Sequence, residues 1–153
     1  MARYITPTLT ITSNAYGATT NPGPTTSPLA ISVTDSLDVT EVVSKIVDAS
    51  TTHGILFDAS EFAAAITAGT EGAFVFLRNL TEGLTTTADV HIGHGTSADL
   101  ADGGGSETTR LMTLKPGEFS FFAYDLEADL IVDASAAVTG ALEAILFVRT
   151  GTA

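Results

Sequence analysis

The histidine pair in the run His91-Ile92-Gly93-His94, with Asp89 just before it, is the feature of the sequence most like a metal site. Imidazole and carboxylate groups are common ligands of transition metals. On a β-strand, residues two apart share a face and residues three apart do not, so Asp89 and His91 align while His94 points elsewhere. A cupin-like metalloenzyme would need another distant ligand, and His53 is the only other histidine. We therefore expect solvated or hydrogen-bonded polar groups here and no metal, and keep the cupin reading as the third hypothesis.

Glu118 is the carboxylate that could act as an acid or base, because it precedes the aromatic residue Phe119. The segment 117–124 offers a simpler interpretation. Its alternation places aromatic residues on both faces of one strand, which predicts a strand that lies between two layers or meets another subunit. The carboxylates of the loops do not form a twelve-residue calcium loop, so they predict a solvated acidic surface; they are Asp99, Asp102, Glu107, Asp125, Glu127 and Asp129.

The remaining chemical motifs are weak. The glycine run 103–105 is followed by neither a helix signal nor a Lys-Ser/Thr pair, so it does not predict a phosphate-binding loop. Asn79-Leu80-Thr81 matches a glycosylation sequon, but no secretory signal is visible and we expect it to stay unmodified. The chain has no cysteine, which excludes disulfides and thiolate chemistry. We expect no catalytic residue, no cofactor and no metal.

The elements that would position these residues are strands. Threonine occurs 25 times, mostly beside apolar residues, and β-branched residues in alternation favour strands. The sequence predicts an all-β, antiparallel, jelly-roll-like β-sandwich. The expected strands are 29–34, 53–59, 72–80, 87–93, 109–114, 117–124, 129–134 and 140–149.

Two segments are less clear. Residues 36–50 fit either a capped amphipathic helix or strand, and we take strand because valine and threonine are frequent. Residues 61–67 are rich in alanine and predict a short helix. Lys115-Pro116-Gly117 predicts a type II turn, with proline at its second position and glycine at its third. The stretch 94–108 predicts a surface loop.

The N-terminal part differs from the rest. Residues 3–13 alternate threonine with apolar residues, which predicts a half-buried strand. Pro7 indicates that the first part of this strand lies at a sheet edge. Residues 14–28 contain three of the five prolines and predict an extended arm that reaches a neighbouring subunit. We therefore divide the chain into an arm, 1–28, and a sandwich domain, 29–153.

Charge narrows the choice of partners. The chain has 153 residues with 18 acidic and 6 basic side chains, a net charge of −12. Such a field repels polyanions, so we expect neither nucleic acid nor an anionic membrane as a partner. No apolar run is long enough to span a bilayer. Trp is absent and Tyr is rare, which disfavours a sugar-binding platform.

The second half of the chain resembles a known group of proteins. The runs Gly72–Leu80, Val90–Gly93, Leu114–Phe119 and Leu142–Phe147 follow one another as they do in small virion structural proteins of tailed bacteriophages. The resemblance covers residues 72–148. It implies a β-sandwich that coats or completes a virion, commonly as a symmetric oligomer.

These observations lead to one functional hypothesis and its alternative. We expect a non-enzymatic capsid decoration or cement protein, a homotrimer on the outer surface of the capsid that binds the major capsid protein or another virion protein. The alternative is a tail or fibre sandwich that binds host glycans. The candidate interaction residues are Tyr4, Ile5, Leu9, Ile11, Pro22, Pro24, Pro28, Phe119, Phe121 and Phe122.

Overall fold

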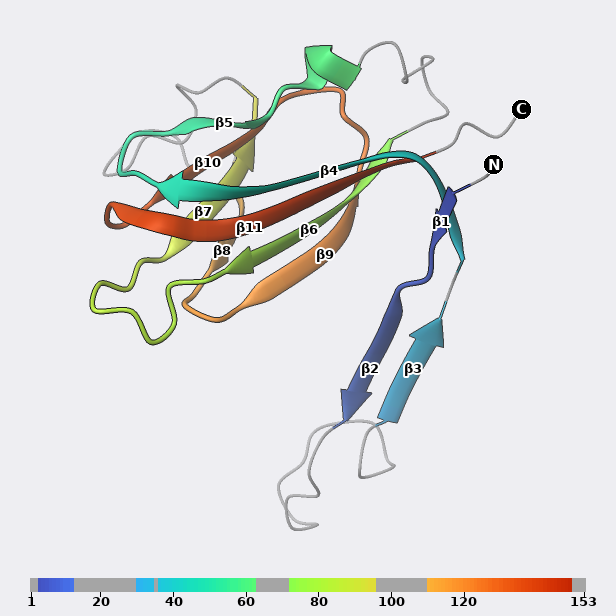
Figure 1. The fold of residues 1–153 in the computed structure, drawn as a ribbon, viewed down its shortest axis with the longest axis horizontal. Coiled ribbons are helices and arrows are strands. Elements are labelled where there is room, and N and C mark those ends of the chain that lie inside the picture. Colours follow the sequence, from blue (N-terminus) through green and yellow to red (C-terminus); the bar gives the residue numbers. More distant parts are fainter. Residues whose placement is uncertain (1–2, 13–29, 35, 63–71, 96–109, 150–153) are drawn as a thin grey trace. The chain divides into compact units, whose positions relative to one another are not determined.

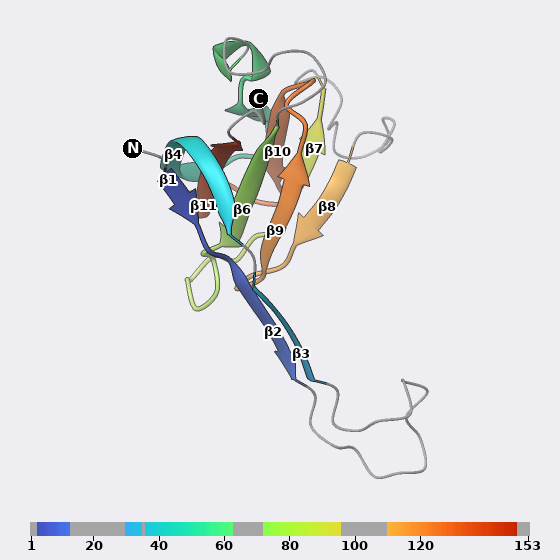
Figure 2. The same ribbon diagram turned by 90° about the vertical axis from the view of Figure 1, so that its right-hand side faces the viewer.

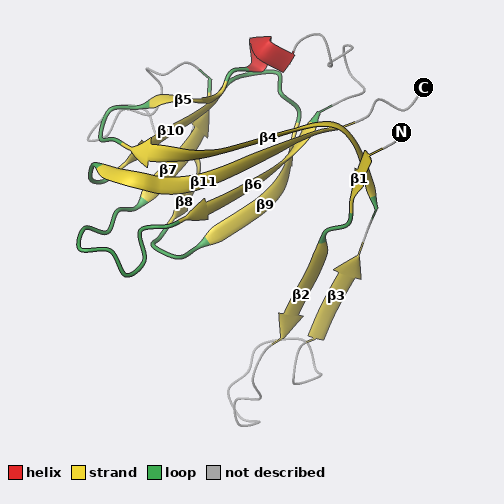
Figure 3. Cartoon of the chain, viewed as in Figure 1, coloured by secondary structure: helices red, strands yellow, loops and turns green. Residues whose placement is uncertain are grey.

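The chain divides into two compact units, which we describe separately: Met1–Val39 and Thr40–Ala153. The computed structural model describes residues 3–12, 30–34, 36–62, 72–95 and 110–149. Most of the residues within these ranges lie in strands (Figure 3).

The first unit contains a two-stranded ribbon. Strand β2 (Thr8–Thr12) pairs antiparallel with β3 (Ala30–Thr34), and the hydroxyls of Thr8 and Thr34 lie 3.1 Å apart. Strand β1 (Arg3–Ile5) is separated from β2 by Pro7, which has no N–H group for a ladder, and pairs with the first residues of β4. Because β3 pairs with β2, the unit extends to Val39, beyond the boundary predicted after residue 28. Of the predicted arm, 1–28, the proline-rich part 14–28 lies outside the described residues.

The second unit is a sandwich of two antiparallel sheets that lie face to face (Figure 1, Figure 2). Sheet I has the order β4-β11-β6-β9 in this unit, and sheet II has the order β5-β10-β7-β8. This arrangement confirms the predicted all-β antiparallel sandwich. The strands of sheet I are β4 (Leu37–Ala49), β6 (Ala73–Asn79), β9 (Phe119–Tyr124) and β11 (Val138–Arg149). Those of sheet II are β5 (Gly54–Phe57), β7 (Val90–His94), β8 (Arg110–Leu114) and β10 (Leu130–Ala134).

The core lies between the sheets and follows from the alternation of side chains along each strand. On β6, Val75 and Leu77 point inward and are fully buried, as are Leu146 and Val148 on β11. Sheet II contributes the inward positions of β7 and β10, which include Val90, Ile92, Leu130 and Val132. Burial of this apolar area is the main favourable contribution to folding, at roughly 25 cal/mol per Å².

The segment 36–50 is a strand, as predicted, because its β-branched residues suit the extended backbone. The short helix expected at 61–67 is a 3-10 turn at Ala59–Phe62, and residues 63–67 lie outside the described part of the chain. The predicted type II turn is present: Gly117 has φ of +82° and the Glu118 N–H donates to the Lys115 carbonyl at 2.9 Å.

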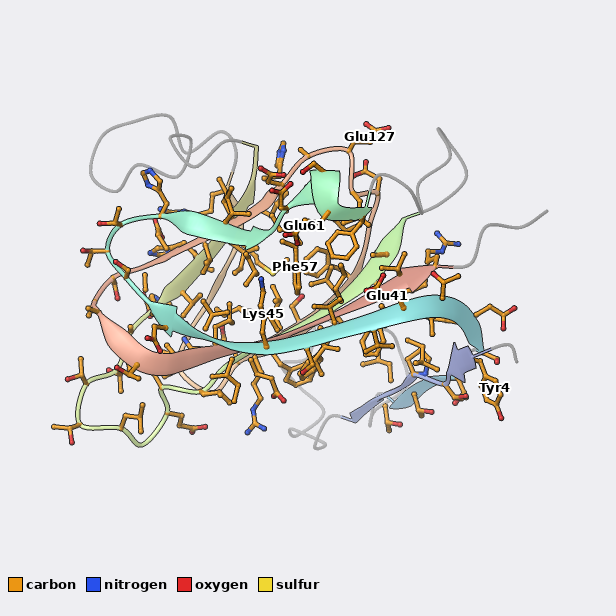
Figure 4. The ribbon with its side chains drawn as sticks, turned by 45° about the horizontal axis from the view of Figure 1, so that its top comes forward. Tyr4, Glu41, Lys45, Phe57, Glu61 and Glu127 are labelled. Carbon is orange, nitrogen blue, oxygen red and sulfur yellow. The ribbon has the colours of Figure 1, made fainter. Side chains whose placement is uncertain are left out.

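Lys45 joins the sheets where β4 faces β5. Its ammonium group donates to the Leu56 carbonyl and lies 4.5 Å from the centre of the Phe57 ring (Figure 4). Burial lowers the pKa of Lys45, and the charge of Glu61 opposes that shift. A cation over an aromatic face and a charged hydrogen bond together hold the two strands in place.

Candidate interaction surface

One outward face of the sandwich is apolar. The side chains of sheet I that point away from the core include five of the chain's eight phenylalanines. We call this surface the aromatic face and define it by Val42, Ile46, Phe74, Phe76, Phe119, Phe121, Ile145 and Phe147. Phe119 is 63% exposed, Ile46 67%, Val42 44% and Phe121 39%, whereas the side chains on the central strands are half-buried.

The register of the strands brings the rings together. Phe76 on β6 is opposite Phe121 on β9, and Phe74 is opposite Ala123, so diagonal neighbours can stack. The Phe74 and Phe121 rings are parallel within 6° with centroids 5.7 Å apart. Phe76 stacks on Phe119 at 6.3 Å, and Phe121 contacts Phe147 at 6.4 Å. Such pairs stabilise each other by about 0.5–1.5 kcal/mol beyond burial, so the rings support one another on this face.

The charges around this face differ from the rest of the chain. The guanidinium of Arg149 lies 5.1 Å from the centre of the Phe74 ring, and Arg78 is opposite Glu143 on β11. Two of the six basic residues therefore flank an apolar surface of a strongly acidic chain. Aromatic residues and arginine are the types enriched at protein interfaces.

The predicted interaction residues fall into three groups. Phe119 and Phe121 belong to the aromatic face. Phe122 does not, because it points inward and packs against the core. In the first unit, Tyr4 is 67% and Leu9 50% exposed, and Ile5 is half-buried. Pro22, Pro24, Pro28 and the side chain of Ile11 lie outside what the structure describes.

Sequence reasoning missed the remaining members of the aromatic face. Residues 73–77 are apolar at every position, which signals a strand with two apolar faces but does not say which face is open. Phe74 and Phe76, which alternate with the core residues of this strand, were the sequence signal that could have indicated a second apolar face.

His91 and Asp89 have partners within the fold. His91 is buried, 9% exposed, and its Nδ1 lies 2.9 Å from the Thr113 hydroxyl. Of the two expected states, solvated or hydrogen-bonded, His91 is in the hydrogen-bonded one, and it is buried because the outward face of sheet II is covered at this position. Asp89 forms an ion pair with Lys115, and the half-buried His94 ends β7. No cluster of three metal-ligating side chains occurs among the described residues.

Glu118 and Asn79 have local partners. The Glu118 carboxylate accepts the backbone N–H of Lys115 at 2.8 Å, within the turn that they share. The buried Asn79 amide donates to the carbonyls of Ala88 and Leu114 at 2.7 and 2.9 Å. Its oxygen accepts both the N–H and the hydroxyl of Thr81. Asn79 thus links the end of β6 in sheet I to β8 in sheet II.

A hollow of about 350 Å³ lies beside the C-terminal end of β9. It is lined mainly by His94, Leu111, Tyr124, Asp125 and Glu127. The Tyr124 hydroxyl donates to the Ala128 carbonyl at 2.8 Å. Burial, followed by the charges of Asp125 and Asp129, raises the pKa of Tyr124 to about 12. The hollow therefore combines an aromatic ring, an imidazole and two carboxylates.

Comparison with known proteins gives no relative: no family model, curated protein or solved structure matches the chain. In the described part of the chain, none of the helices has the length and apolar character needed to cross a bilayer.

Proposed function

We propose that this protein is a non-enzymatic structural protein of a tailed-bacteriophage virion. In this proposal it decorates the outer surface of the capsid as a homotrimer and stabilises the major capsid protein lattice. The resemblance of residues 72–148 to small virion proteins supports the virion assignment.

The observation that carries the proposal is the aromatic face. A monomeric soluble protein rarely exposes a contiguous apolar patch of this kind, and such patches mark interaction sites. Here the patch covers all four strands of sheet I in the second unit and includes stacked, ordered rings. A protein that works by assembly needs such a surface, because the surface gains stability when a partner buries it.

The acidic remainder of the chain fits an exterior location. A net charge of −12 opposes contact with packaged nucleic acid and favours solubility of the exposed surface. The predicted arm, 14–28, would supply the contact with the capsid lattice, since proline-rich segments are extended and suit docking on a neighbour.

The hollow at the end of β9 favours the alternative, a tail or fibre module that binds host glycans. Carboxylates and a tyrosine ring beside a hollow of this size suit hydroxyl-rich ligands. Only Tyr124 offers a ring there, and its hydroxyl is already bonded to Ala128. For this reason we rank glycan binding second.

Quantitative mass spectrometry and electron microscopy of purified particles of the phage that encodes the chain test the proposal. We expect a copy number in a simple ratio to the major capsid protein and density for the chain on the outer capsid surface. Absence from the particle, or a few copies on the tail only, would contradict capsid decoration. A glycan array with the full chain tests the alternative, for which binding abolished by Glu127→Gln would be required.

A further inference from the structure

We infer that the partner of the aromatic face is the chain itself, with three protomers turning these faces inward around a threefold axis. This inference rests on the proposed function, because it names the contact that would form the trimer. It does not specify how the trimer attaches to the capsid.

The dimensions of the sheet suit this arrangement. Four strands at about 4.8 Å give sheet I a width of about 19 Å. Three such sheets that form the sides of a triangular prism each lie about 5.5 Å from the axis, which is close to half of the roughly 10 Å between packed sheets. Phenylalanine side chains then fill the interior without a void.

The distribution of exposure also favours a closed ring. The most exposed members of the face lie on its two outer strands, Phe119 on β9 and Ile46 on β4. The side chains of the central strands are half-buried. In a ring, β9 of one protomer meets β4 of the next, so the most exposed residues receive the closest cover.

Phe119 and Ile46 lie at the same end of sheet I, which the ring requires. Phe119 is opposite Arg78, and Arg78 is opposite Glu143. Ile46 lies beside Gly140, with its Cγ2 3.7 Å from the position of a Cβ there, and Gly140 lies three residues before Glu143 on β11. A rotation about an axis along the strands therefore brings Phe119 to the Ile46 of a neighbour.

Charge permits copies of the chain to meet through this face. Chains with a charge of −12 repel each other over most of their surfaces. The aromatic face is bordered by Arg78, Arg149, Glu143 and Asp48, so its charges balance while the whole chain carries −12. Copies can therefore approach through this face with the least repulsion, and arginine of one protomer can meet Glu143 of another.

Light scattering of the full chain at about 10 μM tests the inference. The expected mass is three times 15.7 kDa. Phe119→Asp and Ile46→Asp, which place charge on opposite sides of the same contact, should each reduce the mass to that of one chain. Leu84→Asp is the matched control: Leu84 is 46% exposed in the loop after β6, and the mass should stay that of the wild type. Circular dichroism of each variant establishes that the sandwich is folded.

A double variant sharpens the test. Phe119→Asp with Ile46→Lys in one chain restores an attractive pair only if β9 of one protomer meets β4 of another, so the threefold mass should return. A monomeric or dimeric wild type, single variants that remain trimeric, or a double variant that stays monomeric would each overturn the inference. A monomeric chain found on the capsid overturns the trimer and leaves capsid decoration standing, whereas a trimer absent from the capsid overturns capsid decoration and leaves the trimer contact standing.

Discussion

The two sheets of the sandwich share one core but have opposite outward faces. On sheet I the outward residues are apolar and exposed, led by Phe119 and Phe121. On sheet II the outward positions of β7 and β10 include His91 and Asp133, which are polar and buried. The centre of the sheet II face, on β7 and β10, is therefore closed, although Ile55 on β5 and Leu111 on β8 are 51% and 44% exposed at its edges. On the aromatic face the central side chains remain half-buried and the edges are exposed.

This difference indicates what the centre of each face does. A buried polar side chain requires a partner, and His91 has one in Thr113. Among the described residues of the second unit, nothing covers the exposed apolar surface, which gains stability when another molecule covers it. Substitutions on sheet II should therefore change folding, whereas substitutions on the aromatic face should change assembly.

The largest expected effect is at Asn79, the residue that joins the two sheets. Asn79→Ala removes the bonds to Ala88, Leu114 and Thr81 and leaves buried groups unsatisfied, so we expect a loss of about 3–5 kcal/mol in the free energy of unfolding. Urea denaturation measures it. Thr81→Val is the matched variant, because it removes only the hydroxyl, and it should lose about 1–2 kcal/mol. A loss of less than about 1 kcal/mol in the free energy of unfolding of Asn79→Ala would contradict the role of Asn79 in linking the two sheets.

The next effect distinguishes two histidines three positions apart in β7. His91→Ala should lower the free energy of unfolding by about 1–2 kcal/mol, because a buried hydrogen bond to Thr113 disappears. His94→Ala, at the half-buried end of the strand, should stay within about 0.5 kcal/mol. Thermal unfolding at pH 8 compares the stability of the two variants with that of the wild type. Equal losses would mean that the outward face of sheet II is not closed at His91.

The smallest effect concerns pH and the hollow beside β9. The pKa of Tyr124 is about 12 in the folded chain against 10.0 ordinarily, so the folded state holds this proton more tightly. Between pH 10 and 12 the unfolded chain releases it first, and stability falls as the pH rises. In Tyr124→Phe this part of the alkaline loss should disappear. Urea titrations from pH 8 to 12 measure it, with equal slopes expected below pH 9; an unchanged slope above pH 10 would contradict the assignment.

Local patterns predicted local structure well. The alternation in 117–124 and 129–134, the β-branched residues of 36–50 and the Pro116-Gly117 turn each depend on neighbours in sequence, and the structure confirms them. Two features of the site could not be predicted this way. Phe74 and Phe76 point outward because sheet II covers the other side of β6, and His91 is buried because of contacts remote in sequence. Both depend on tertiary packing, which periodicity does not encode.

The hydrogen bonds of Asn79 have a consequence for the order of events during synthesis. The residue begins an Asn-Leu-Thr sequon, and a glycosyltransferase must reach the same amide nitrogen that donates to Ala88 and Leu114 in the folded chain. Modification and folding therefore compete for one atom. If the chain were produced in a eukaryotic secretory pathway, any glycan would have to be attached before β6 meets β8. Each molecule that received one would be unable to join its two sheets, so modified chains should accumulate only in the unfolded fraction.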